Sequence, residues 1–440
     1  MANLQNLSAT EAARLIAEKN LSPVALLDDC LAQIARHDGD IAAWIHVDEK
    51  GARATARDCE READDHRLRG PLHGVPVAIK DIIDVAGMTT TYGAKPFAHR
   101  RADKDAACVA RLRAAGAVIL GKVATTEFAY FEPAATRNPW NSAHTPGGSS
   151  SGSAAAVAAR MAPLALGTQT VGSVVRPAAF CGIAGYKGTF GAVPVEGSSA
   201  LARSFDHIGI FARKIADARL AFAILSGRAL GHAGAAPPRL ALAPELIARA
   251  EPDVAAQIGL AVACLAAAGA EVTEITLPAS FAAIHAAGST ILAGEFATYQ
   301  EDFFRDHAAD YRPRTRELVA AGRAQAATDY VKAQQARAQF RDDMMPILRS
   351  AGVLLCPAAA GTAPAGLAST GDPWFCAPWT AIGVPAVALP TAIGAAGMPH
   401  AIQLVGSYDG DAQLLAAADW CEGVLAFDLA PSRLGVPGKP

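Results

Sequence analysis

The chain has 440 residues, of which 51% are hydrophobic and 18% are charged, and its formal net charge is −3. These values allow a large buried core and exclude a general electrostatic attraction to nucleic acids or anionic membranes. The eight cysteines form no Cys-x-x-Cys pair, which argues against a zinc site or a disulfide framework. With no signal peptide or membrane span recognised, we expect a cytoplasmic monomer or homodimer without metal or cofactor that acts on a small molecule.

The first half of the chain alternates helices with short buried strands. Ser8 and Ser22-Pro23 have the pattern of helix starts, with a serine cap and, in the second case, a proline in the first turn. Pro76 indicates either an edge strand or the start of a strand. The expected elements are two helices within 8–37, a helix over 49–68, a strand over 75–80, a helix over 106–115, a strand over 117–121, a loop over 132–148, a helix over 154–161 and a strand over 164–166.

The second half is mainly helical from 213 to 350, and short strands return near the end. Strands are expected at 271–275, 353–355, 386–389 and 401–405. Helices around 281–350 would either cap an active site or, the favoured interpretation, form a packed layer. No internal repeat or linker is found. We therefore predict one domain over 1–440, of the α/β class, with a large mixed, mostly parallel twisted sheet covered by helices on both faces.

Two enzyme classes share short motifs with this chain and are excluded by their wider context. Val-Ala-Ile-Lys at 77–80 matches the strand lysine of protein kinases, but no glycine-rich phosphate loop, His-Arg-Asp or Asp-Phe-Gly accompanies it. Gly-x-Ser-x-Gly at 148–152 matches the nucleophile turn of α/β-hydrolases. That turn must follow a buried strand, and the preceding residues 138–146 are rich in Pro and Asn.

A third interpretation explains the lysine and the serines together. The chain resembles the amidase signature family, in family order and over nearly its whole length. The motifs that carry the resemblance are Gly-Val-Pro-Val-Ala-Ile-Lys-Asp at 74–81, Thr-Arg-Asn-Pro-Trp-Asn at 136–141, the glycine- and serine-rich block 146–187, Ser-Phe-Asp-His-Ile-Gly at 204–209, Gly-Val-Pro-Ala at 383–386 and Gln-Leu-Val-Gly at 403–406.

The resemblance implies a catalytic role for three side chains. Ser173 would be the nucleophile, Ser149 a bridging serine entered through a cis peptide bond, and Lys80 the terminal base. Lys80 must be uncharged to accept a proton, and burial lowers the pKa of a lysine in that direction. The backbone N–H groups of Thr170, Val171, Gly172 and Ser173 would bind the oxyanion.

The resemblance also bears on the substrate contacts and on the turn that contains Ser173. Tyr130, Phe131, Trp374 and Phe375 are candidate substrate-binding residues, although each can equally be aromatic core filler. The family's usual Thr-Asp-x-Gly-Gly-Ser-x-Arg is replaced by residues 168–176, in which Gln169 stands for the acid, Val171 for a glycine, and the arginine is displaced to Arg176. This pattern suggests that a charge pair has been replaced by a neutral arrangement.

We therefore expect a hydrolase that cleaves a C–N amide-type bond through an acyl group on Ser173. Small neutral or aryl-bearing amides are the favoured substrates, and carbamates (urethanes) and ureas remain open. One alternative is the glutaminase subunit of a tRNA-dependent amidotransferase, which would require a partner protein. Another is a binding protein on the same fold with impaired catalysis.

Overall fold

The computed structural model describes residues 4–231 and 236–432. Its central feature is one sheet of eleven strands in the order β1-β3-β2-β4-β6-β5-β10-β11-β9-β7-β8. The strands are β1 (Trp44–Val47), β2 (Pro76–Lys80), β3 (Val118–Val123), β4 (Leu164–Gln169), β5 (Ala184–Lys187), β6 (His207–Ala212), β7 (Arg239–Leu242), β8 (Glu271–Glu274), β9 (Val353–Pro357), β10 (Ala386–Ile393) and β11 (Pro399–Val405).

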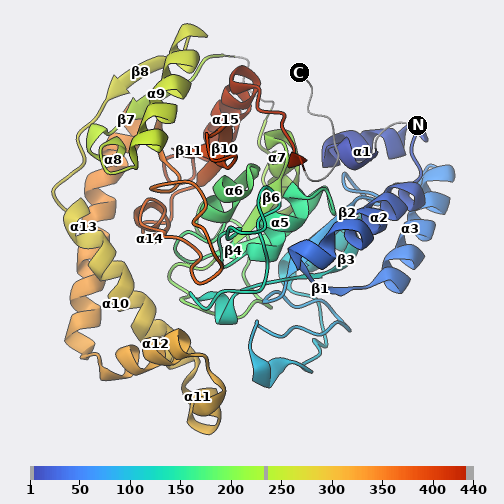
Figure 1. The fold of residues 1–440 in the computed structure, drawn as a ribbon, viewed down its shortest axis with the longest axis horizontal. Coiled ribbons are helices and arrows are strands. Elements are labelled where there is room, and N and C mark those ends of the chain that lie inside the picture. Colours follow the sequence, from blue (N-terminus) through green and yellow to red (C-terminus); the bar gives the residue numbers. More distant parts are fainter. Residues whose placement is uncertain (1–3, 232–235, 433–440) are drawn as a thin grey trace.

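Helices flank the sheet along its length (Figure 1). They are α1 (Ala9–Ala17), α2 (Pro23–Ile41), α3 (Glu49–Asp64), α4 (Ala107–Ala114), α5 (Ser151–Ala158), α6 (Val175–Cys181), α7 (Ile215–Ser226), α8 (Pro244–Ile247), α9 (Pro252–Ala267), α10 (Phe281–Tyr299), α11 (Glu301–His307), α12 (Pro313–Ala324), α13 (Ala327–Ala351), α14 (Ala377–Ala381) and α15 (Asp411–Leu425). Among the described residues, no helix combines the length and hydrophobicity needed to cross a bilayer.

The sheet is mixed, as expected, but its parallel pairs are confined to the two ends. Strands β3, β2 and β4 pair in parallel, as do β9, β7 and β8. All pairs from β4 through β6, β5, β10 and β11 to β9 are antiparallel. The expected parallel majority is therefore wrong. Short connections such as residues 394–398, between β10 and β11, favour antiparallel pairing because a parallel pair needs a long crossover.

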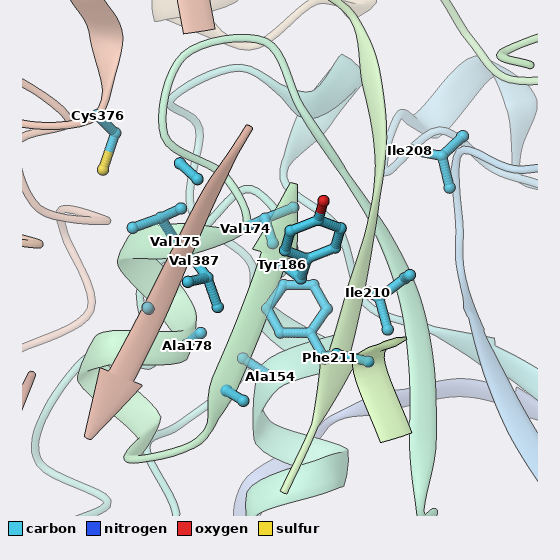
Figure 2. Packing of buried hydrophobic residues seen from close by; sticks show 14 of the residues in the cluster. Ala154, Val174, Val175, Ala178, Tyr186, Ile208, Ile210, Phe211, Cys376 and Val387 are labelled. Carbon is cyan, nitrogen blue, oxygen red and sulfur yellow. The ribbon is translucent and has the colours of Figure 1, made fainter. Parts of the chain in front are cut away.

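Successive residues of β5 show how the two faces of the sheet are covered. A Cβ on Gly185 would press against Ala178 of α6, whereas the ring of Tyr186 packs edge-on against Phe222 of α7. Because side chains alternate along a strand, α6 and α7 lie on opposite faces. Figure 2 shows Val175 and Ala178 of α6 next to β10, a strand that α6 contacts.

Two helices, α5 and α6, are buried along their whole length. They pack against each other and against the central strands. Both begin directly after a serine-containing turn, so the core of the molecule fixes where each turn lies.

The helices from α10 to α13 form the flank opposite α2 and α3 (Figure 1). Helix α10 packs along α12 and α13 and also contacts α14. That these helices are an insertion within a single domain is a prediction from the sequence.

Most helices and strands expected from the pattern are present. The caps are confirmed: the side chains of Ser8 and Ser22 accept hydrogen bonds from the N–H groups of Glu11 and Ala25. Pro76 marks a strand start, because β2 lies between β3 and β4 and is not an edge. The sequence analysis does not predict strands β1, β5, β6 and β7, of which β1, β5 and β7 have only four residues each.

Candidate active site

Lys80 is the last residue of β2, and its side chain is fully buried. Its Nζ lies 2.7 Å from Ser149 Oγ and 2.8 Å from Thr168 Oγ1. Burial holds the pKa of Lys80 well below its usual range, and the negative charge of Asp206 opposes that shift. Two hydroxyl groups are thus available to an amine whose charged form is disfavoured.

Ser149 lies in the turn that leads into α5. The Gly148–Ser149 peptide bond is cis, as the resemblance implied. Ser149 is 2% exposed, and its carbonyl accepts a hydrogen bond from the N–H of Thr126. Ser151 Oγ donates to the carbonyl of Gly147 at 2.7 Å, which closes the turn around Ser149.

Ser173 lies in the turn between β4 and α6. Gln169 organises this turn: its Oε1 accepts hydrogen bonds from the N–H groups of Val174 and Val175 at 2.7 and 3.0 Å. Its Nε2 donates to Thr380 Oγ1, which in turn donates to the carbonyl of Val171. A neutral side chain therefore holds the turn where the family pattern has an acid.

The backbone of the turn is open to a ligand. The N–H groups of residues 170–173 have no acceptor among the described residues. Val171 does not have positive φ, so the side chain that replaces the usual glycine is accommodated without backbone strain. Gly172 is needed for a different reason, because a Cβ there would lie 2.9 Å from Pro373 and 3.0 Å from Cys376.

Ser149 and Ser173 line the same narrow inner cavity, which also has Gly172 and Arg176 in its wall. A larger outer cavity of about 340 Å³ adjoins it. Four residues line both and mark where they meet: Tyr130, Phe131, Val171 and Pro373. The remaining wall of the outer cavity is largely apolar and includes Phe205, Ile284, Leu292, Leu318 and Ala381.

Three of the four candidate substrate-binding residues line these cavities. Tyr130 and Phe131 lie at the junction, and Trp374 lines the outer cavity, where it stacks on His285 at 4.5 Å. Phe375 is 3% exposed and lines neither cavity. Its ring packs on Trp374, so the structure places it in the core behind the wall.

Several residues around the site were missed by the sequence analysis. Thr168 contacts Lys80 because β4 pairs with β2, a register that no spacing along the chain reveals. Asp206 accepts a hydrogen bond from Thr170 Oγ1 at 2.6 Å. Helix α10 provides Ile284, His285 and Leu292 to the outer cavity, and its apolar residues gave no signal that distinguished wall from core.

Comparisons with known proteins show the family of the chain. Residues 25–415 match the family model described as Amidase. The chain belongs to the amidase signature family. It is 35% identical, over 95% of its length and 96% of the relative's, to a Roseiflexus castenholzii protein named as a subunit of glutamyl-tRNA(Gln) amidotransferase.

Solved structures of amidases share the fold. A crystal structure described as an amidase superposes with a TM-score of 0.89 and 32% identity, covering 95% of this chain and 99% of that one. The native peptide amidase of Stenotrophomonas maltophilia superposes with a TM-score of 0.81 and 28% identity, covering 96% and 98%. Family membership makes this chain an amidase-family hydrolase; its own substrate is a separate question.

Proposed function

We propose that this protein hydrolyses small amides through an acyl intermediate on Ser173, with Ser149 as the bridging serine and Lys80 as the base. The observation that carries the proposal is the contact of 2.7 Å between a fully buried lysine amine and a serine that shares a cavity with a second serine. A serine hydroxyl attacks only when a base removes its proton, and this arrangement provides the base without a histidine.

In the proposed reaction, uncharged Lys80 takes the proton of Ser149, and Ser149 takes that of Ser173. Ser173 Oγ forms a bond to the amide carbon. When the C–N bond breaks, Ser149 gives a proton to the leaving nitrogen and regains one from Lys80. Water then attacks the ester and passes its proton along the same path, so that Ser173 leaves with a proton and a carboxylic acid and an amine are released.

The turn 170–173 supports the charged intermediate in this proposal. Its N–H groups have no acceptor among the described residues, and three of its residues, Val171, Gly172 and Ser173, line the cavity that holds Ser173. One such donor contributes about 3–4 kcal/mol to the transition state in other acyl-transfer enzymes. The largely apolar outer cavity favours substrates with an apolar or aryl group, and carbamates and ureas, which also present a carbonyl, stay within the proposed class.

The test is turnover of a chromogenic 4-nitroanilide by the purified protein. Ser173→Ala and Lys80→Met should each lower kcat by about a thousandfold or more, because the relay acts as one unit. Circular dichroism and thermal melting should show that both variants fold. An active-serine probe should label the peptide that contains Ser173 in the wild type. Wild-type-like turnover by either folded variant would overturn the assignment, and absence of both labelling and turnover would favour a binding protein.

A second candidate function is the glutaminase subunit of a tRNA-dependent amidotransferase. It is supported by several relatives that are named as a subunit of glutamyl-tRNA(Gln) amidotransferase and match this chain over 95% or more of its length. The discriminating experiment compares ammonia release from glutamine with hydrolysis of anilides, primary amides and carbamates by the protein alone. Activity on glutamine only in the presence of partner subunits would favour this second function.

A further inference from the structure

Arg176 is a buried cation without a counter-ion. It is 1% exposed, and among the described residues no carboxylate lies within ion-pairing distance of it. Its pKa is lowered by burial to about 10, so it remains charged near neutral pH. A buried charge is costly unless it is paired, and the proposed relay of Lys80, Ser149 and Ser173 does not use this one.

The neighbours that could neutralise Arg176 do not form an ion pair with it. The negative charge of Asp372 favours the charged form of Arg176, but its carboxylate lies beyond ion-pairing distance. Gln169 stands where the family pattern has an acid, and its amide is already satisfied by Val174, Val175 and Thr380. Burial raises the pKa of the nearby Cys376 thiol to about 12, so that thiol is uncharged near neutral pH.

Arg176 lines the inner cavity, and its guanidinium group lies near other residues of the cavity wall. Its Nη2 donates to the carbonyl of Gly148 at 2.6 Å and to Thr370 Oγ1 at 3.3 Å. Its Cζ lies 5.9 Å from the ring centroid of Phe131, at the junction of the two cavities. Nε and Nη1 have no partner among the described residues. In the described part of the chain, a residue that lines the cavity of both serines therefore has two buried charge-assisted donors without a partner.

We infer that Arg176 binds a carboxylate carried by the substrate itself, so that the enzyme prefers amides with an anionic group a few atoms from the scissile carbonyl. This inference rests on the proposed function and replaces its preference for neutral amides. Asp372 favours one orientation of the substrate. It lines the outer cavity, where its negative charge disfavours an anion. The carboxylate is thus directed inward, and the apolar or aryl part of the substrate outward.

The test compares mono-4-nitroanilides of malonic, succinic and glutaric acid with neutral isosteres in which the carboxylate is replaced by an isopropyl group. For at least one chain length, wild type should have a kcat/KM about tenfold to a hundredfold higher for the acid, as expected for hydrogen bonds to a charged group. In Arg176→Met this ratio should fall towards one. Because both substrates are measured on the same variant, a general loss of activity or folding cancels in the ratio.

Arg249→Met is the matched control, since Arg249 also lies over an aromatic ring, that of Trp374 at 4.0 Å, but does not line the inner cavity. It should keep the wild-type ratio. Equal rates on acids and isosteres by wild type, or a ratio unchanged in Arg176→Met, would overturn the inference while leaving the proposed hydrolysis intact.

Binding to Ser173→Ala, measured by calorimetry, separates the two hypotheses if no amide is turned over. Binding of the acid about tenfold or more tighter than its isostere would support the carboxylate site without any hydrolysis. Equal affinities for the two would reject it.

Discussion

At the scale of single residues, burial shifts the pKa values of the ionisable side chains at the proposed site. Lys80 has a lowered pKa because it is fully buried, and the negative charge of Asp206 opposes that shift. Burial also raises the pKa of Asp206 to about 6, although hydrogen bonds from Thr170 and from the N–H groups of Leu201 and Ala202 favour its charged form. The pKa of the proposed base is therefore influenced by a carboxylate that does not contact it.

Asp206→Asn should move the acid limb of the kcat/KM profile to lower pH. At pH values above about 6 the wild-type carboxylate is ionised and stabilises the ammonium form of Lys80, so its removal lowers the pKa of Lys80 further. A smaller fraction of the base is then protonated at a given pH. The profile is measured from pH 5 to 9 on one anilide. An unchanged limb, or a shift to higher pH, would contradict this coupling.

The sequence predicted the three proposed catalytic residues but not what surrounds them. Lys80, Ser149 and Ser173 stand in motifs whose order along the chain is distinctive. Thr168 and Asp206 depend on sheet register and on a turn, which the spacing of residues does not encode. Phe375 is a candidate substrate contact in the sequence that can equally be core filler, and only its neighbour Trp374 lines the cavity.

At the scale of elements, helix α5 holds the Ser149 turn by packing against backbone. The N–H of Gly152 donates to the carbonyl of Ala124 at 2.9 Å, and the N–H of Ala124 donates to that of Ala43 at 2.8 Å. A Cβ on Gly152 would overlap the N atom of Ala124 and the O atom of Ala43. The helix can approach the end of β3 this closely only because residue 152 has no side chain.

Gly152→Ala should destabilise the protein by about 3 kcal/mol or more, because backbone cannot move aside as a flexible side chain can. Activity should fall as well, since α5 would carry the Ser149 turn with it. Gly259→Ala is the control: Gly259 lies on the exposed face of α9, a Cβ there meets nothing, and alanine should stabilise the helix by up to about 1 kcal/mol. Urea unfolding of both variants measures the difference, and equal stabilities would show that α5 is not docked in this way.

At the scale of the whole molecule, the outer cavity is built from parts of the chain that lie far apart in sequence. Tyr130 and Val171 come from the loops near the central helices, Leu292 from α10, Leu318 from α12, and Trp374 from the loop before α14. The α10–α13 flank therefore supplies part of the wall that we propose selects the substrate, while the proposed chemistry belongs to the sheet and its inner helices.

Gly288→Leu should narrow the outer cavity without disturbing the fold. Gly288 lines this cavity on α10, and a Cβ there meets no atom within 4 Å. We expect kcat/KM for bulky aryl amides to fall by about tenfold and that for short primary amides to fall less, with no loss of thermal stability. Ala286→Leu, on an exposed position of the same helix, should leave this size preference unchanged. An equal effect on large and small amides would place the substrate elsewhere.

The complete burial of α5 and α6 has a consequence for folding during synthesis. Helices of seven and eight residues do not persist alone in water, so both must wait for the surfaces that enclose them. Part of that enclosure comes late in the chain, since α6 packs against β10 and β11. A nascent polypeptide that has already emerged past residue 200 carries the lysine and both serines, yet it becomes a hydrolase only when its final third has docked.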